Sequence, residues 1–198
     1  MSSPQPVTDL LADLARGLGA FGVRWFLFGA QAAILHGAAR LSADVDVTVD
    51  LGARSSRDLV AALSRVGFGL RVADAEGFVE ATRVLPLVHL ASRMPLDLVL
   101  AGPGLEEQFF ARVTERLVGH VRVPVVCAED LVAMKILAGR SRDMEDVTAI
   151  IRAHRDLDVE GIRGTLRILE RALDRADLMV ELERILASTK GGTPGPNA

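Results

Sequence analysis

The chain has 198 residues and a formal net charge of −3 from 23 basic and 26 acidic side chains. This length suits one domain, or one domain with a helical appendage, and it can bury a sizeable core. The slightly negative charge excludes a global basic field for nucleic acid, so any such surface must be local. The single cysteine, Cys127, excludes an internal disulfide and favours a reducing, cytoplasmic location.

The two ends of the sequence predict neither a targeting segment nor a membrane anchor. The N-terminus lacks a basic region followed by a long apolar stretch, so we expect no secretion signal. No run approaches the roughly 18 uninterrupted apolar residues of a membrane span. Residues 1–6 and 188–198 are rich in proline, glycine and polar side chains, and we predict disordered ends there.

The first predicted element is a helix over residues 7–18, in which apolar residues recur at the spacing of one helical face. Gly17 and Gly19 are expected to mark its end. Residues 25–28 then predict a strand, and a short helix of small residues follows from Gly29.

An alternating segment after this helix predicts a strand that carries Asp44 and Asp46. Side chains two apart on a strand share one face, so these two carboxylates and Thr48 form an acidic face opposite three valines. Two carboxylates about 4 Å apart repel by roughly 4 kcal/mol at the effective dielectric of a protein surface. A cation would relieve this repulsion, and Mg²⁺ is suitable because it prefers carboxylate oxygens and substrate phosphates.

The middle of the chain predicts more strands and helices in mixed order. We expect a helix at 55–66, a short strand at 68–72, a turn or helix at 77–82, a hairpin of 84–90 with 95–100, a short helix at 105–113, and a strand or hairpin at 117–126. The pattern indicates an α/β (α+β) fold with a small mixed β-sheet flanked by helices.

Asp97 is a third candidate acid, because it lies in the middle of the predicted strand 95–100. Strand propensity disfavours aspartate, so this carboxylate needs either solvent or a partner. One interpretation is an ordinary exposed strand position. The other is that Asp97 joins Asp44 and Asp46 in a site.

The stretch 128–153 predicts two helices separated by Gly139, with Ser141 capping the second. Lys135 lies close to the apolar stripe of the first helix, so its stem can bury while its ammonium either binds a triphosphate or reaches solvent. Asp143 and Asp146 share a face of the second helix. They are either site residues or ordinary surface acids, with Asp143 complementing the helix dipole and Arg142 pairing with Asp146.

Residues 158–187 are again helical in pattern, as two helices or as one helix bent at 161–164. Arginines recur every four residues at 163, 167, 171 and 175 and predict a basic ridge, unless they pair with Glu170 and Asp174 on a solvated face. We therefore divide the chain into a core at 7–126 and a helical C-terminal part at 127–187.

Gly29-Ala30, thirteen intervening residues and Asp44-Val45-Asp46 resemble the signature of the nucleotidyltransferase superfamily with the DNA polymerase β-like fold. Within it, the segment 26–49 is similar to small bacterial nucleotidyltransferases, including toxins of abortive-infection toxin–antitoxin systems. The family pattern has Gly or Ser where this chain has Ala30, which offers only a backbone N–H to a phosphate.

The resemblance implies a nucleotidyltransferase fold with a helical C-terminal part, and an enzyme that transfers a nucleoside monophosphate from a nucleoside triphosphate to a hydroxyl acceptor. It implies that Asp44, Asp46 and Asp97 are catalytic and hold one or two Mg²⁺ ions. It implies nucleotide binding, ATP included, by a second set of residues, namely Gly29, Ala30, Lys135, Arg140, Asp143 and Asp146. RNA as acceptor and an antitoxin protein as partner are further expectations.

Two other functions remain open on the sequence alone. Ala30 favours a catalytically silent nucleotide-binding module of the same fold, and an adenylyltransferase for aminoglycoside-like small molecules would differ only in its acceptor. Other chemistries lack their motifs, because the chain contains no GxGxxG after a strand, no GxxxxGK[ST] loop and no GxSxG. The four histidines are too scattered in sequence to predict a zinc site.

Overall fold

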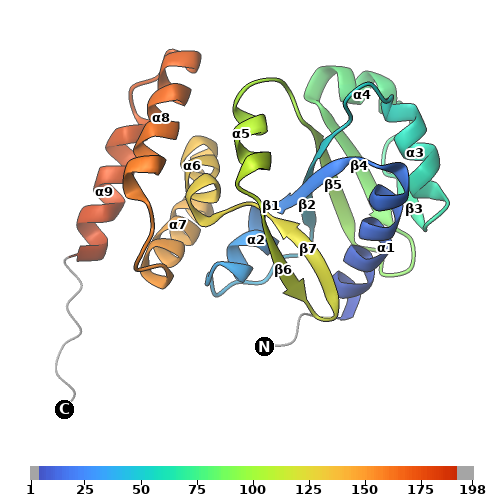
Figure 1. Ribbon diagram of the computed structural model, residues 1–198, viewed down its shortest axis with the longest axis horizontal. Coiled ribbons are helices and arrows are strands. Elements are labelled where there is room, and N and C mark those ends of the chain that lie inside the picture. The colour runs from blue at the N-terminus through green and yellow to red at the C-terminus, as the bar shows by residue number, and fades with distance from the viewer. Residues whose placement is uncertain (1–4, 191–198) are drawn as a thin grey trace. The chain divides into compact units, whose positions relative to one another are not determined.

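The computed structural model describes residues 5–190, which form seven strands and nine helices (Figure 1). The predicted mixed α/β class, with helices flanking a mixed sheet and a helical C-terminal part, is confirmed. The chain divides into two compact units. One unit takes the residues up to Ala32 together with Leu41–Cys127, and the other takes Ala33–Arg40 together with the residues from Ala128 onwards.

The first unit carries the sheet. Its strands are β1 (Arg24–Phe28), β2 (Val45–Asp50), β3 (Phe68–Leu70), β4 (Val84–His89), β5 (Pro95–Leu100), β6 (Thr114–Val118) and β7 (Val121–Val125). Their order is β3-β4-β5-β2-β1-β7-β6. The pairs β2–β5 and β1–β7 are parallel and the other four pairs are antiparallel, so the sheet is mixed as predicted.

The predicted hairpin of residues 84–90 and 95–100 is confirmed as the antiparallel pair β4–β5, and residues 117–126 form a hairpin whose first strand starts earlier, at Thr114. Alternation along β2 and β5 decides which face is core. The side chains of one face are fully buried, namely Val45, Val47, Val49, Leu96 and Leu98. The opposite face carries the aspartates, which are only half-buried.

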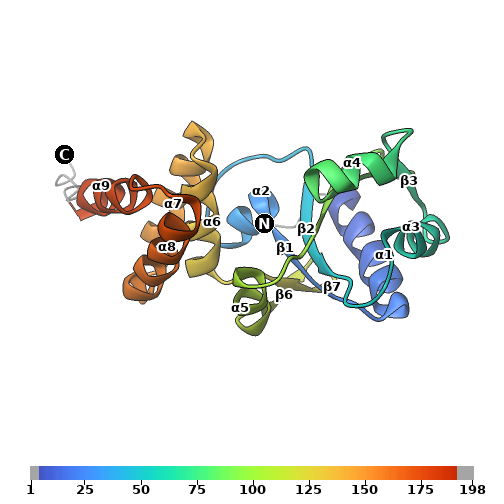
Figure 2. The same ribbon diagram turned by 90° about the horizontal axis from the view of Figure 1, so that it is seen from above.

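The helices of this unit are α1 (Gln5–Phe21), α3 (Ser56–Ser64), α4 (Ala75–Thr82) and α5 (Leu105–Ala111), and α2 (Gly29–Leu35) begins in it. α1 and α3 lie side by side, and they contact β7 and β3 respectively (Figures 1 and 2). The segment 77–82, which the sequence left between turn and helix, is helical within α4.

The predicted end of the first helix at Gly17 and Gly19 is wrong, because α1 continues to Phe21 and ends before Gly22, whose φ is 73°. Gly17 serves packing instead. A Cβ at this position would lie 2.8 Å from Cγ2 of Val66, so the missing side chain lets α1 approach the segment that follows α3 closely.

α1 is also fixed to the β4–β5 hairpin through the buried side chain of His89. Nε2 of His89 lies 3.0 Å from Oδ2 of Asp13 on α1, and Nδ1 lies 2.7 Å from Oγ of Ser92 in the hairpin loop. Both ring nitrogens therefore have partners, which a buried imidazole requires.

The second unit is built from α6 (Ala128–Ala138), α7 (Ser141–Ala153), α8 (Val159–Leu173) and α9 (Leu178–Lys190), which contact one another (Figure 2). Its core is formed by apolar side chains from all four helices, namely Leu131, Val132, Ile136, Val147, Ile150, Ile162, Leu166, Leu182 and Ile185. None of the helices within residues 5–190 has both the length and the apolar character of a membrane span.

Three predicted details of the termini and the second unit are corrected. The last helical region forms two helices, as one of the two alternatives predicted, and the other alternative, one helix bent at 161–164, is wrong because Gly161 lies in the first turn of α8. The residue before α7 is Arg140, so Ser141 is its first helical residue and not its cap. α1 begins at Gln5 and α9 ends at Lys190, so parts of the predicted disordered ends are helical, while 1–4 and 191–198 lie outside the described residues.

We predict that Asp13→Ala lowers the free energy of unfolding by about 1–3 kcal/mol, because Nε2 of His89 then stays buried without its partner. Urea denaturation measures this loss. The matched control is Asp9→Ala on the same helix, where an exposed carboxylate accepts a hydrogen bond from Gln5. That control should change stability by less than about 0.5 kcal/mol. Equal losses in the two variants would contradict a stabilising Asp13–His89 contact.

Candidate active site

The parallel pair β2–β5 brings two of the three predicted acids together. Asp46 and Asp97 are register partners on these neighbouring strands, and both point to the half-buried face of the sheet. Neighbouring strands lie about 4.8 Å apart, so the two carboxylates begin from adjacent backbone positions. Asp44 directly precedes β2 and is exposed.

Gly29 is set against Asp46 by the antiparallel pairing of β1 with β2, in which Phe28 is the register partner of Asp46. Gly29 has a φ of 65°, and a Cβ at this position would overlap the Asp46 carboxylate, lying 2.7 Å from its carbon. Glycine is therefore required twice over, by the backbone conformation and by the neighbouring acid. Ala30, the next residue, is buried in the first turn of α2.

The carboxylate of Asp44 is oriented by Ser42, which the sequence interpretation overlooked. The hydroxyl of Ser42 lies 2.6 Å from Oδ1 of Asp44 and 3.2 Å from its backbone oxygen. The backbone oxygen also accepts a hydrogen bond of 3.4 Å from Nε2 of the buried Gln31. These hydrogen bonds hold the loop before β2 in place at Asp44, the residue that precedes the strand.

Asp97 is engaged by Arg71, which lies directly after β3. Nη2 of Arg71 contacts Oδ1 of Asp97, and Nε of Arg71 donates to the backbone oxygen of Leu87 at 2.9 Å. The third acid therefore has a partner, and its side chain is partly exposed at this strand position. Arg71 is a second residue of this site that sequence reasoning missed.

The chemistry of these donors suits a hard divalent cation, because Mg²⁺ is commonly bound by one or two carboxylates, with water and substrate phosphates completing its shell. Asp44 and Asp46 can supply that pair. Among residues 5–190 no group of three or more His, Cys, Asp or Glu side chains gathers as a metal cluster. Asp97, the third predicted acid, contacts the guanidinium of Arg71.

The second unit holds a buried ion cluster around Lys135, whose side chain is only 5% exposed. Nζ of Lys135 lies 3.0 Å from Oδ1 of Asp143 and 2.7 Å from Oδ2 of Asp146. Nη1 of Arg40 reaches the same oxygen of Asp146 at 2.7 Å. The lysine does not extend to solvent, so snorkelling is excluded.

The same cluster corrects the predicted surface pairing on α7. Asp146 binds Lys135 and Arg40, and Arg142 is exposed with no ion pair to Asp146. Asp143 lies in the first turn of α7, as predicted. Arg140 is exposed at the residue before this helix.

The predicted arginine ridge is largely absent. α8 ends at Leu173, so Arg175 lies beyond it and pairs with Asp177, while Arg163 pairs with Glu160 and Glu183. Arg167 and Arg171 remain exposed on α8. The acids that pair with Arg163 and Arg175 are therefore not the predicted Glu170 and Asp174.

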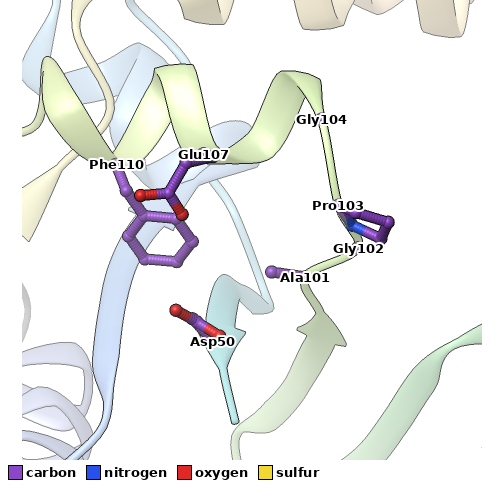
Figure 3. Close-up of a pocket in the computed structure, with 7 residues that line it drawn as sticks. All are labelled: Asp50, Ala101, Gly102, Pro103, Gly104, Glu107 and Phe110. Carbon is purple, nitrogen blue, oxygen red and sulfur yellow. The ribbon is translucent and has the colours of Figure 1, made fainter. Parts of the chain in front are cut away.

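A cavity of about 370 Å³ lies at the far end of β2 from Asp44, lined by Asp50, Ala101, Gly102, Pro103, Gly104, Glu107 and Phe110 (Figure 3). Its two carboxylates are both bound by Arg24, whose guanidinium lies 4.8 Å from the centre of the Phe110 ring. The hydrogen bond from Arg24, with one from the backbone N–H of Gly52, holds the pKa of Asp50 below its ordinary value. These acids are neutralised by Arg24. Asp50 lies four residues along β2 from Asp46, on the same face of the strand.

The family model described as "Nucleotidyl transferase AbiEii toxin, Type IV TA system" matches residues 12–192. No curated protein matches the chain.

Solved nucleotidyltransferases share the fold. An antigenic nucleotidyltransferase-like protein from Paracoccidioides brasiliensis is 17% identical with a TM-score of 0.57, covering 92% of this chain and 94% of that one. The antibiotic-resistance factor ANT(2'')-Ia is 13% identical with a TM-score of 0.59, covering 86% and 95%. The lincosamide antibiotic adenylyltransferase LnuA, solved with lincomycin bound, is 12% identical with a TM-score of 0.52, covering 77% and 99%. At these identities the likeness shows the fold alone.

We predict that Gly29→Ala destabilises the protein more than Gly52→Ala, by at least about 1 kcal/mol. Both glycines have positive φ, so both substitutions carry the left-handed cost of roughly 1–2 kcal/mol. Only at Gly29 would the new methyl overlap a neighbour, because nothing lies within 4 Å of a Cβ at Gly52. Chemical denaturation of both variants measures the difference, and equal losses would show that Asp46 moves aside freely.

For Lys135→Ala we predict a loss of about 3–5 kcal/mol in the free energy of unfolding, because two largely buried carboxylates then lose their shared cation. Arg142→Ala, on the exposed side of α7, serves as the control and should stay within about 0.5 kcal/mol. A mild effect of Lys135→Ala, similar to that of the control, would mean that the cluster rearranges or hydrates without cost. Thermal and urea unfolding of both variants supply the measurement.

Proposed function

Because the chain belongs to the family of AbiEii nucleotidyltransferase toxins of type IV toxin–antitoxin systems, we propose that it carries out Mg²⁺-dependent transfer of a nucleoside monophosphate to a hydroxyl of an RNA acceptor. Family membership supports a nucleotidyltransferase. The observation that carries the site assignment is the register of β2 and β5, which places Asp46 beside Asp97 with Asp44 two residues away.

The proposed reaction forms a bond between the acceptor oxygen and the α-phosphorus of the nucleoside triphosphate. The bond from this phosphorus to the bridging oxygen breaks, and pyrophosphate leaves. Asp97 is suited to accept the proton of the acceptor hydroxyl, since a positioned carboxylate can act as a general base. Bound Mg²⁺ would supply Lewis-acid stabilisation of the charge that develops on the phosphate oxygens.

The other residues of the first unit orient this machinery. Asp44 and Asp46 would hold the cation, Ser42 fixes the direction of the Asp44 carboxylate, and Gly29 leaves the space that the Asp46 carboxylate occupies. Preorganised groups of this kind lower the barrier because they do not reorganise during the reaction. A backbone N–H at Gly29 or Ala30 is proposed to contact the phosphates.

Within the second unit, we propose that four residues contribute to nucleotide binding, namely Lys135, Arg140, Asp143 and Asp146. The support is the resemblance of this run to the C-terminal motif of bacterial nucleotidyltransferases, together with the pairing of Lys135 with both acids. In this proposal the two aspartates hold the lysine, and the exposed Arg140 is available to a phosphate as a bidentate donor.

The acceptor and the partner are the remaining parts of the proposal. Exposed Arg167 and Arg171 on α8 support RNA, because arginine side chains are suited to contact phosphates. The family description names a type IV toxin–antitoxin system, which supports an antitoxin protein as partner. A reducing cytoplasmic setting agrees with the lone cysteine.

We predict that Asp44→Asn and Asp46→Asn each lower Mg²⁺-dependent transfer at least about 100-fold, which is the upper range for losing even an outer-shell partner of a catalytic metal. Both variants should remain folded, because each removes one charge from a repulsive group. The measurement is incorporation of each labelled nucleoside triphosphate into RNA, protein and aminoglycoside pools. Asp50→Asn, which changes an acid on the same strand outside the site, should keep most of the activity.

Four outcomes would contradict parts of this proposal. Full activity in Asp44→Asn and Asp46→Asn, or an equal loss in Asp50→Asn, would remove the acids from catalysis. Labelling of the protein pool alone would reject RNA as the acceptor. Labelling of the aminoglycoside pool alone would also reject RNA as the acceptor, and it would show that the acceptor is a small molecule.

A further inference from the structure

The ion pair between Arg71 and Asp97 is built into the sheet. The backbone N–H of Arg71 donates to the oxygen of Pro86 at 3.0 Å, and its Nε donates to the oxygen of Leu87 at 2.9 Å. Pro86 is in turn the register partner of Asp97 on the next strand. The guanidinium therefore lies along β4 and meets the third acid from the side of β3.

The pair is accessible to solvent, in contrast to the Lys135 cluster. The side chains of Arg71 and Asp97 are 35% and 38% exposed, whereas those of Lys135 and Asp146 are 5% exposed. Exposed ion pairs contribute little to stability, so a competing cation can separate one at low cost. Arginine also stays charged at every physiological pH, so Asp97 has a permanent counter-ion until another cation takes its place.

We propose that Arg71 is the resting counter-cation of Asp97, which a divalent metal ion must displace before all three aspartates can share it. This inference rests on the proposed Mg²⁺ site and adds a competitor that belongs to the chain itself. The described contacts of Asp44 are with the neutral side chains of Ser42 and Gln31. In the proposed site Asp44 and Asp46 hold the divalent ion, and recruitment of Asp97 depends on the release of Arg71.

A purely orienting role for Arg71 predicts the opposite sign. If the guanidinium only held Asp97 in a metal-binding direction, its removal would weaken metal binding. If it competes, removal strengthens metal binding, because the carboxylate is then free to turn toward the ion. The sign of the change in metal affinity thus separates the two roles.

The experiment is a titration of Mn²⁺ into nucleotide-free protein, followed by the electron paramagnetic resonance signal of the free ion. Arg71→Gln should bind Mn²⁺ about two- to fivefold more tightly than the unaltered protein, the scale expected for an exposed ion pair. Arg71→Met, which keeps the aliphatic stem, should behave in the same way. Arg71→Lys retains the charge and should differ from the unaltered protein by less than twofold.

Arg83→Gln is the matched control. Arg83 pairs with Glu106 and donates to the backbone oxygen of Leu100, so its removal changes the charge of the same unit by the same amount, away from Asp97. This variant should leave Mn²⁺ affinity within about 1.5-fold of the unaltered protein, as expected for screened exposed charges. In an Asp97→Asn background, Arg71→Gln should have no effect, since the proposed competition requires the carboxylate.

Unchanged or weaker Mn²⁺ binding in folded Arg71→Gln and Arg71→Met would overturn the inference and leave the proposed function standing. Equal tightening in Arg83→Gln would overturn it as well, since a general field effect would then explain the change. Failure of the proposed function has a different signature. In that case the unaltered protein shows no Mn²⁺ binding that depends on Asp44 and Asp46, and the inference falls with it.

Discussion

The parallel pairing of β2 with β5 sets the main physical constraint in this protein. Its register places Asp46 and Asp97 side by side on adjacent strands, on the same face of the sheet. Backbone positions about 4.8 Å apart bring their charges close enough to repel. The fold relieves this by giving the acids different neighbours. Asp46 lies against Gly29, and Asp97 turns to Arg71. The sheet thus holds an acidic face that is stable without being assembled into one cluster.

The Lys135 cluster and the Arg71–Asp97 pair differ in how far their charges are exposed to water, and this difference decides what each can do. The side chains of Lys135 and Asp146 are only 5% exposed, so each of these two charges needs its partner. The Arg71–Asp97 pair is open to water, so its partners can exchange with solvent or with another ion. Buried pairs suit a role that holds a residue in place, whereas an exposed pair suits a step in which one ion replaces another.

The sequence predicted the features that depend on local periodicity. Alternation located the strands at Asp46 and Asp97, and glycine with small residues located the turn into α2 at Gly29. The sequence did not predict the contacts that depend on residues far apart along the chain. Arg40 pairs with Asp146, 106 positions away, and Arg71 reaches Asp97 only because β3 and β4 bring it there. Gly17 looked like a helix end, but its small size serves packing, which no local pattern reveals.

Such a fold can persist while most of the sequence differs, as the low identities of proteins that share it illustrate. Strand pairing uses backbone hydrogen bonds, so many side chains can encode the register that aligns β2 with β5. Only a few positions are restricted by physics. A residue with a Cβ at Gly29 must both adopt positive φ and displace the Asp46 carboxylate, whereas Ala30 must only be small enough to remain buried. The absence of a hydroxyl at Ala30 is therefore compatible with the fold, and Ser42, two residues before Asp44, places a hydroxyl on its carboxylate.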